Sequence, residues 1–146
     1  MLSPCLFCRI AAGELAAAVV FENAISLAFL DHRPLFAGHC LLIPKAHFET
    51  LRDLPEALAG QLFANAQILS AAMEDGLGAE GSFVAVNNRV SQSVPHLHVH
   101  VVPRRKGDGL KGFFWPRRKY RDATEMEDTR RALHEAIVRI QTSTQP

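Results

Sequence analysis

Two features are missing from this 146-residue sequence: a long apolar run and a strong charge of one sign. No stretch approaches the roughly 20 apolar residues that a membrane-spanning helix needs, and residues 1–5 lack the basic and then apolar pattern of a secretory signal. The 16 Lys and Arg residues nearly balance the 15 Asp and Glu residues, which argues against a whole-protein attraction to nucleic acid or anionic membranes. We therefore expect a cytoplasmic protein that binds neither nucleic acid nor membranes.

Cysteine is also scarce, with three residues in the chain. An odd number cannot all pair within one chain, and in a reducing compartment the spacing Cys5-x-x-Cys8 indicates metal or redox chemistry more readily than a disulfide. Cys40 is flanked by Leu41 and Leu42, so we expect it to be buried and inert.

The composition is that of an ordinary globular protein, with 48% apolar and 21% charged residues, and the length fits a single domain over residues 1–146. Periodicity and turn residues predict strands over 17–21, 26–30, 39–43, 83–87 and 96–102. They also predict a single helical turn over 5–13, a central helix from a capping box at Asp53–Glu56 to Gly76, with Asn65 on its solvent face, and a C-terminal helix over 122–141. This order predicts an α+β domain with a five-stranded antiparallel sheet.

Half of the basic residues lie in one segment, since eight of the 16 Lys and Arg residues fall between Arg104 and Arg121. Residues 103–121 also contain two prolines and three glycines, so we expect a loop. Its basic side chains either contact phosphate or simply form a solvated surface. Residues 112–116, which include Trp115, are too apolar for an idle loop. We expect them to pack on a partner subunit or over the mouth of a site.

Three histidines alternate with apolar residues in His96-Leu97-His98-Val99-His100. On a β-strand they project from one face, about 7 Å apart. A buried imidazole needs hydrogen-bond partners and has no advantage over leucine in packing, so metal ligation and nucleophilic catalysis remain. Three side chains with this spacing reach one ion only with help from strand curvature. Catalysis requires one aimed imidazole, and its ordinary pKa of about 6.5 suits a nucleophile at pH 7.

This run matches the signature of the histidine triad (HIT) family, three histidines that alternate with apolar residues and are followed by two more apolar residues. Further segments resemble the family in the same order. They are Cys5–Ile10 with Gly13-Glu14, Leu27–Asp31, Gly38-His39, Leu42–His47 and Gln92–Pro95. The resemblance covers roughly residues 5–105. It implies the HIT fold and a homodimer in which two sheets join into a continuous ten-stranded sheet.

The resemblance also implies chemistry at the α-phosphate of a nucleoside monophosphate derivative. In the family the middle histidine, here His98, attacks the α-phosphorus to give a nucleotidyl-histidine intermediate that water hydrolyses. The implied catalytic residues are His96, His98, His100, Gln92 and Ser93, and the phosphate also lies near Asn87 or its neighbour Asn88.

For the nucleoside, the resemblance places apolar side chains around the base and a carboxylate on the ribose hydroxyls, where it accepts hydrogen bonds from a vicinal diol. These residues are Phe7, Ile10, Leu15 and Phe29 for the base and Asp31 for the ribose. From the residues alone, core packing explains the apolar set equally well, and Asp31 also suits a turn before Arg33-Pro34. His32 stands where an apolar residue is common, which bears on base preference.

Some members of the family bind a structural zinc, and the matching residues here are Cys5, Cys8, His47 and His96. Two thiolates and two imidazoles complete a tetrahedral shell with no open position. Such a zinc braces the fold and leaves the chemistry to His98. No catalytic metal is expected.

Two branches of the family remain open. The segment Arg104–Asp108 resembles the branch that cleaves dinucleoside polyphosphates, whereas Cys5-x-x-Cys8 and the short N-terminus resemble the phosphoramidase branch. We favour hydrolysis or transfer on phosphoramidate-type substrates. The alternatives are hydrolysis of dinucleoside polyphosphates such as Ap3A or Ap4A, a nucleotide-binding regulatory protein with incidental turnover, and a metal-binding protein without catalysis.

Overall fold

The structure is a computed structural model that describes residues 4–111 and 117–143. The chain falls into two compact units, Met1–Asp108 and Gly109–Pro146, and the single-domain organisation over residues 1–146 stays a prediction. No helix among the described residues is long and apolar enough to cross a bilayer. Trp115 and its neighbours at 112–116 lie outside the described residues, so their packing also stays a prediction.

The first unit contains the predicted five-stranded antiparallel sheet, with the strand order β1-β2-β3-β5-β4. The strands are β1 (Val19–Glu22), β2 (Ser26–Leu30), β3 (Cys40–Pro44), β4 (Gly81–Ala85) and β5 (Val99–Arg104). Because β5 inserts between β3 and β4, the edges of the sheet are β1 and β4. The α+β prediction is confirmed.

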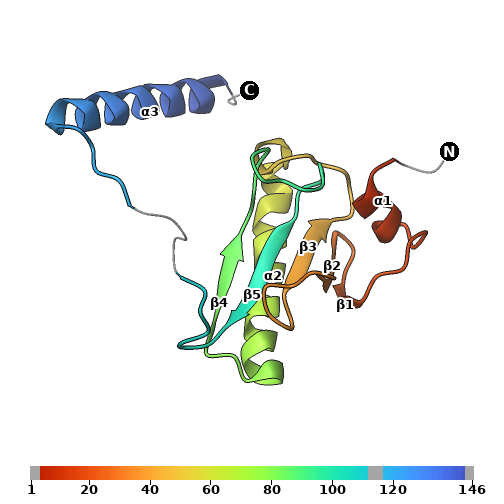
Figure 1. The fold of residues 1–146 in the computed structure, drawn as a ribbon. Helices are drawn as coiled ribbons and strands as arrows, with labels where there is room; N and C mark the ends of the chain where they lie inside the picture. The colour runs from red at the N-terminus through yellow and green to blue at the C-terminus, as the bar shows by residue number, and fades with distance from the viewer. Residues whose placement is uncertain (1–3, 112–116, 144–146) are drawn as a thin grey trace. The chain divides into compact units, whose positions relative to one another are not determined.

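Each face of the sheet is covered differently. The long helix α2 (Glu56–Leu77) packs across β3, β4 and β5 (Figure 1). Side chains alternate along a strand, so Leu42 of β3 lies in the core with α2, whereas Leu41 and Ile43 pack on the other face with Phe7 of the short helix α1 (Leu6–Ala11). Residues 97, 99 and 101 belong to the α2 core, which leaves the histidines that alternate with them on the α1 face.

The strand that carries the histidine run is shorter than predicted, because β5 begins at Val99 rather than at His96. The register pairs Leu42 with Val99, so its continuation brings Pro44 opposite Leu97. Proline has no N–H to continue the ladder. The amide of Leu97 instead donates to the carbonyl of Phe48, which lies beyond the end of β3, at 2.6 Å.

The predicted capping box at the start of the central helix is also misplaced. The carboxylate of Asp53 accepts hydrogen bonds from the backbone and the hydroxyl of Thr50, at 2.9 and 2.7 Å, and so caps the preceding 3₁₀ turn Leu51–Asp53. Helix α2 follows directly from Pro55 and continues through Gly76. It ends at Leu77, and the capping residue Gly78 adopts φ 65°, a left-handed conformation that glycine tolerates best.

Asn65 on α2 was expected in solvent and is buried, with 6% of its surface exposed. Its side-chain amide donates to the hydroxyl of Ser26 on β2 at 2.7 Å, and its Oδ1 accepts from Asn23 at 3.3 Å. A buried amide is stable only with such partners. The polar bridge therefore fixes α2 against the β1–β2 turn, a contact that helical periodicity cannot reveal.

Replacing Asn65 with alanine is expected to lower the free energy of unfolding by about 1–3 kcal/mol, because the buried hydroxyl of Ser26 loses its donor and the side-chain amide of Asn23 loses its acceptor. Urea unfolding at pH 7 measures the change. Gln67→Ala, an exposed position on the same helix, is the matched control and should stay within about 0.5 kcal/mol of the wild type. Equal losses in the two variants would show that the bridge contributes nothing.

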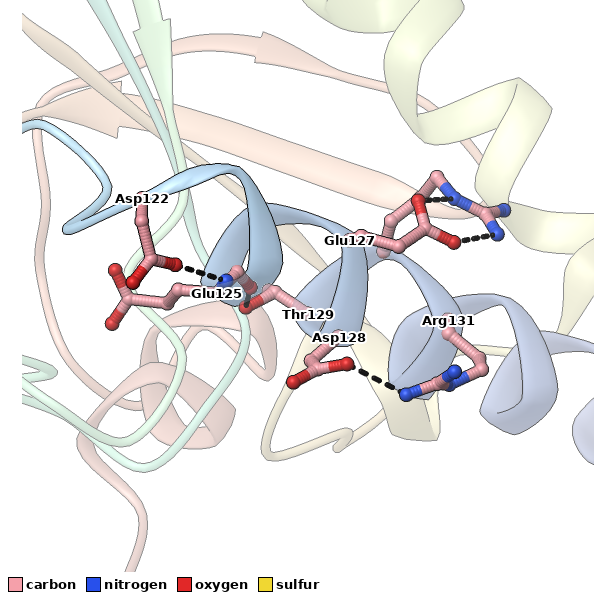
Figure 2. Close-up of polar contacts among 7 residues, drawn as sticks. Asp122, Glu125, Glu127, Asp128, Thr129 and Arg131 are labelled. Atoms are coloured by element: carbon pink, nitrogen blue, oxygen red, sulfur yellow. Dashed lines mark hydrogen bonds and ion pairs between the residues drawn. The ribbon is translucent and has the colours of Figure 1, made fainter.

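The second unit contains α3 (Ala123–Ser143), which corresponds to the predicted C-terminal helix. Its start is capped as the sequence suggested: Asp122 Oδ1 accepts from the backbone of Glu125 at 2.8 Å (Figure 2). None of its described side chains is buried within this unit, and Leu133 has 61% of its surface exposed. Local capping and charge pairs such as Asp128–Arg131, at 2.6 Å, therefore support this helix.

Candidate active site and metal cluster

His98 lies one residue before β5 and is buried, with 2% of its surface exposed. Its Nδ1 is 2.8 Å from the backbone carbonyl of His96. A carbonyl only accepts, so Nδ1 carries the proton and the Nε2 of the neutral ring presents a lone pair. The rings of Phe7 and His100 stand edge-on to it, at centroid distances of 5.2 and 4.9 Å. The backbone thus fixes the tautomer that a nitrogen nucleophile needs.

His100, on β5, belongs to a chain of contacts that leads away from His98. Its Nδ1 is 3.0 Å from Nε2 of His39, whose own Nδ1 accepts from the amide of Leu35 at 3.1 Å. Burial lowers the pKa of His100 to about 4; the charges that His98 and His39 carry when protonated act in the same direction, and Asp31 acts against them. His100 is therefore neutral at pH 7.

The low pKa of His100 is expected to make the fold less stable in mild acid. In the unfolded chain its pKa is about 6.5, so below that pH the unfolded state binds more protons, and the stabilisation present above pH 6.5 is lost as the pH falls towards 4. We expect the free energy of unfolding to fall by about 2 kcal/mol between pH 7 and pH 4.5, a figure reduced because the ring is partly exposed to solvent.

Urea unfolding between pH 7 and 4.5 tests this expectation when wild type and His100→Gln are compared. Both proteins keep the other histidines, so the difference between the two profiles isolates His100. The variant should show the flatter dependence on pH. Parallel profiles would contradict the assignment.

Four side chains that bind metals gather on the other side of His98. Cys5 and Cys8 lie at the start of α1, His47 follows β3, and His96 precedes β5. One ligand atom from each lies within 4.8 Å of the others. The tertiary fold thus brings together residues from three distant parts of the sequence.

The hydrogen bonds of His96 direct a lone pair into this cluster. Its Nε2 donates to the carbonyl of Pro44 at 2.8 Å, so Nδ1 is unprotonated, and burial lowers the pKa of the ring more than this hydrogen bond raises it. Around Nδ1 lie the sulfurs of Cys5 and Cys8, each at 3.5 Å, and Nδ1 of His47 at 3.2 Å. Two thiols and a second imidazole thus crowd one lone pair, whereas a cation in place of the thiol protons satisfies all four groups.

The spacing in the cluster fits a tetrahedral shell. Metal bonds of about 2.0–2.3 Å place neighbouring ligand atoms about 3.3–3.8 Å apart. The contacts around His96 span 3.2–3.5 Å, and Cys8 Sγ lies 3.2 Å from His47 Nδ1. Two thiolates would neutralise a divalent ion, which lowers the cost of placing it beside a buried histidine. The residues present therefore fit a closed Cys₂His₂ metal site.

The residues expected around the base form part of the core on the α1 face. Phe7 and Phe29 pack edge-to-face at 5.4 Å, and Ile10 joins them in the same cluster. Leu15, half-buried after α1, is not among the members of that cluster. The side chain of His32 is 90% exposed, so in this arrangement it does not enclose a base.

Asp31 follows β2 and contacts both a turn and the histidine chain. One carboxylate oxygen accepts from the amide of Arg33 at 2.9 Å, the geometry of an Asx turn. The other lies 3.8 Å from Nε2 of His39. Its side chain keeps 17% exposure, so the carboxylate holds the turn and remains reachable by a ligand.

The loop before the triad is held by Gln92. Its Oε1 accepts from the amide of Arg89 at 2.7 Å, and its Nε2 donates to the carbonyl of Glu49 at 2.6 Å. The neighbouring Ser93 is exposed and lines a hollow of about 550 Å³ beside the metal cluster. Gln92 therefore stabilises the loop in this conformation, and Ser93 is accessible.

The two asparagines after β4 differ in their contacts. Asn88 Oδ1 accepts from the amide of Leu51 at 2.8 Å and ties the loop to the turn before α2. Asn87 is exposed. Of the two residues between which the sequence left the choice open, Asn88 is engaged in the fold and Asn87 is accessible to a ligand.

The predicted basic loop begins later than expected, because β5 extends to Arg104. Arg104 forms a two-point ion pair with Asp108, at 2.6 and 3.0 Å. Arg105 donates to the carbonyl of Leu77 at 2.5 Å. Arg104 and Arg105 thus brace the turn that closes the first unit. A phosphate would have to compete with Asp108 and the carbonyl of Leu77 for these two side chains.

The sequence profile of the HIT domain matches residues 12–107. The chain belongs to the histidine triad (HIT) family. An uncharacterized HIT-like protein of Mycobacterium tuberculosis is 41% identical to this HIT protein over 92% of the chain and 93% of its own length. The adenosine 5'-monophosphoramidase of Schizosaccharomyces pombe is 33% identical over 77% and 83%. The bis(5'-nucleosyl)-tetraphosphatase of the same organism is 33% identical over 62% and 50%.

Solved structures of HIT proteins have the same fold. A HIT family member from Bacillus subtilis superposes with a TM-score of 0.81 at 33% identity, over 91% of this chain and 96% of its own. A zinc-bound histidine triad family protein from Mycobacterium smegmatis gives a TM-score of 0.71 at 36% identity, over 96% and 97%. The HIT fold expected from the resemblance is confirmed.

His39 is the residue of this site that sequence reasoning missed. It is buried, with 3% of its surface exposed, and it contacts both His100 and the amide of Leu35. The only sequence signal was its place in the segment Gly38-His39, which resembles the family but suggests no partner. The pairing with His100 arises because β3 and β5 are neighbours in the sheet.

Proposed function

We propose that this HIT protein is a hydrolase or transferase that acts at the α-phosphate of nucleoside monophosphate derivatives, with phosphoramidates as the favoured substrates and His98 as the nucleophile. The observation that carries the proposal is the hydrogen bond from Nδ1 of His98 to the carbonyl of His96, at 2.8 Å. It leaves the Nε2 lone pair for attack. The relative with a named phosphoramidase activity supports the choice of substrate.

The proposed reaction has two displacements at phosphorus. In the first, Nε2 of His98 forms a bond to the α-phosphorus while the phosphorus–nitrogen bond of the substrate breaks, and the leaving amine takes the electron pair and a proton. In the second, water attacks the phosphorus and the bond to Nε2 breaks, which restores the lone pair. The proton that the amine takes in the first displacement comes from solvent, and the water of the second displacement gives its hydroxyl group to the phosphate and returns a proton to solvent, so that one water is consumed overall.

Residues around His98 would bind the rest of the nucleotide. Asp31 suits the ribose hydroxyls, since its carboxylate keeps some exposure. Phe7 and Phe29, which are buried, would form the apolar floor beneath a base. Asn87 and Ser93, both exposed near the triad loop, would donate to phosphate oxygens.

We further propose that Cys5, Cys8, His47 and His96 hold a structural Zn²⁺. The closed set of four ligands, the tetrahedral spacing and the lone pair that His96 directs into the cluster support this ion. The zinc-bound relative supports it further. The ion would join α1 to the segments that follow β3 and precede β5, and it would take no part in the displacement at phosphorus.

A substrate panel tests the proposed activity. The purified full-length protein is incubated with an adenosine phosphoramidate, with diadenosine tri- and tetraphosphate, and with the corresponding guanosine phosphoramidate. We expect kcat/KM to be at least about tenfold higher for a phosphoramidate than for either dinucleotide. The reverse order would favour the dinucleoside polyphosphatase, an activity that another relative carries. Tight nucleotide binding without cleavage would favour a nucleotide-binding regulatory protein.

We also propose a homodimer, as the family resemblance implies. Phe63 on α2 and Val84 on the edge strand β4 are exposed, by 39% and 42%, and line one hollow. Apolar side chains gathered at a sheet edge and its covering helix suit a contact with a second copy. Sedimentation equilibrium should give twice the mass of the chain, and Phe63→Glu should shift the equilibrium towards the monomer.

A further inference from the structure

Two histidine clusters flank His98. They differ in the backbone group that contacts a ring nitrogen of His96 in one cluster and of His39 in the other. In the cluster around His96 that group is the carbonyl of Pro44, an acceptor. In the cluster of Asp31, His39 and His100 it is the amide of Leu35, a donor. Since a neutral imidazole carries one proton, the backbone group decides which nitrogen keeps it.

The donor amide of Leu35 fixes the tautomer of His39. Its N–H points a hydrogen at Nδ1 of His39, at 3.1 Å, so that nitrogen is unprotonated and Nε2 carries the proton. Burial lowers the pKa of His39 and exceeds the opposing effect of Asp31, which keeps the ring neutral at pH 7. The carboxylate of Asp31, 3.8 Å from Nε2, favours a hydrogen on that nitrogen.

This tautomer decides the chemistry of the cluster. Asp31, His39 and His100 lie close enough together to suggest a second metal site. However, Nε2 of His39, the atom that would coordinate, has no lone pair while Leu35 donates to the other nitrogen. Its N–H instead donates to Nδ1 of His100 at 3.0 Å. The cluster is therefore a hydrogen-bond chain.

We propose that His39 is a positioning residue that holds His100 in the tautomer protonated at Nε2, so that His100 presents a hydrogen-bond donor beside His98. This inference rests on the proposed function, and it adds a role for a residue outside the triad. The chain runs from the amide of Leu35 through His39 to His100. The tautomer of His100 depends on that of His39, which in turn depends on the hydrogen bond from Leu35.

The proposed tautomer matters because of charge at the reacting phosphate. The rings of His98 and His100 are 4.9 Å apart, and His98 presents a lone pair. With a second lone pair at Nε2, His100 would repel both the nucleophile and the phosphoryl oxygens. With a hydrogen there, it donates to an oxygen whose negative charge grows during attack.

The wild-type protein tests the chain without substrate. Long-range ¹H–¹⁵N spectra of the zinc-loaded, ¹⁵N-labelled full chain at pH 7 distinguish a protonated from an unprotonated ring nitrogen. We expect His39 and His100 each to show an unprotonated Nδ1 and a protonated Nε2. A second equivalent of Zn²⁺ should leave these shifts unchanged. A proton on Nδ1 of His100, or a metal-induced shift at His39, would overturn the proposal.

Two substitutions then separate the links. In His39→Asn the side-chain oxygen replaces Nδ1 and can accept from Leu35, but nothing reaches His100. In His39→Gln the side-chain amide replaces Nε2 and can donate to His100. We expect the ¹⁵N shifts of His100 in the asparagine variant to move towards an average of the two tautomers, and those in the glutamine variant to remain at the wild-type values.

Kinetics with the adenosine phosphoramidate complete the test. A transition-state donor is worth roughly 10²–10³-fold in kcat. In His39→Asn only part of the His100 population carries the donor, so kcat should fall about tenfold with little change in KM. His39→Gln should recover most of this loss. Equal spectra and equal kcat in the two variants would overturn the proposal. If no nucleotide is cleaved, the proposed function fails, while the spectra still decide the tautomer.

Discussion

Replacement of His98 with alanine is expected to abolish turnover of an adenosine phosphoramidate, with kcat lowered by at least about 10³-fold, because no other group would take the place of the attacking nitrogen. His98 is the triad residue whose Nδ1 donates to a backbone carbonyl, at 2.8 Å, and so presents Nε2 unprotonated. Stopped assays with an α-phosphate-labelled substrate measure the loss. In single-turnover experiments the wild type should also retain label on the protein, and the variant should retain none.

Two controls separate loss of the nucleophile from loss of the fold. His134→Ala removes an exposed histidine of α3 and should leave kcat unchanged. Circular dichroism should show that His98→Ala keeps its secondary structure, although the ring leaves a gap beside Phe7, whose ring centroid lies 5.2 Å away. A folded His98→Ala protein with wild-type turnover would remove His98 from the mechanism.

Removal of zinc is expected to have the largest effect on stability. An ion present at 1,000 times its Kd stabilises a fold by about 4 kcal/mol, and 1 kcal/mol shifts the Tm of a chain of this size by roughly 3–4 °C. We therefore expect one zinc per chain by atomic spectroscopy and a fall in Tm of at least about 10 °C with a strong chelator. Without the ion, two cysteines and His47 would remain packed against one lone pair at His96.

The three cysteines supply matched variants for this prediction. Cys8→Ser removes a ligand and should lower both the zinc content and the Tm. Cys40→Ser makes the same chemical change in a buried cysteine on the α2 face, whose sulfur contacts the carbonyl of Gly38 at 3.2 Å, and should retain a full equivalent of zinc. Full zinc content and an unchanged Tm in Cys8→Ser would exclude this cluster as the site.

Much of the fold could be predicted because the strands and α2 follow strong local patterns. The alternation of Leu97, Val99 and Val101 with the histidines predicted which side chains face the core, and the structure buries all three apolar residues completely. The capping of α3 by Asp122 was predicted because the box lies within four residues. Such features depend on neighbours in the sequence, which a local reading can weigh.

The errors share a different cause. Asn65 is polar and lies on the helix face expected in solvent, yet Ser26 and Asn23 form a polar pocket for it. The histidine strand starts at Val99 because Pro44 of another strand lies opposite the place where the ladder would continue. In both cases the deciding partner is distant in the sequence, and helix or strand periodicity carries no information about it.

The sequence by itself determined that three histidines share one face, that His96 has two cysteines and His47 as candidate co-ligands, and that the chain resembles the HIT family. The tertiary structure decided which nitrogen of the imidazole meets a backbone group in His98, His96 and His39. A carbonyl holds the proton of His98 on Nδ1 and that of His96 on Nε2, and an amide sets His39. Residue type supplies an imidazole, and the fold selects which of its nitrogens keeps a lone pair.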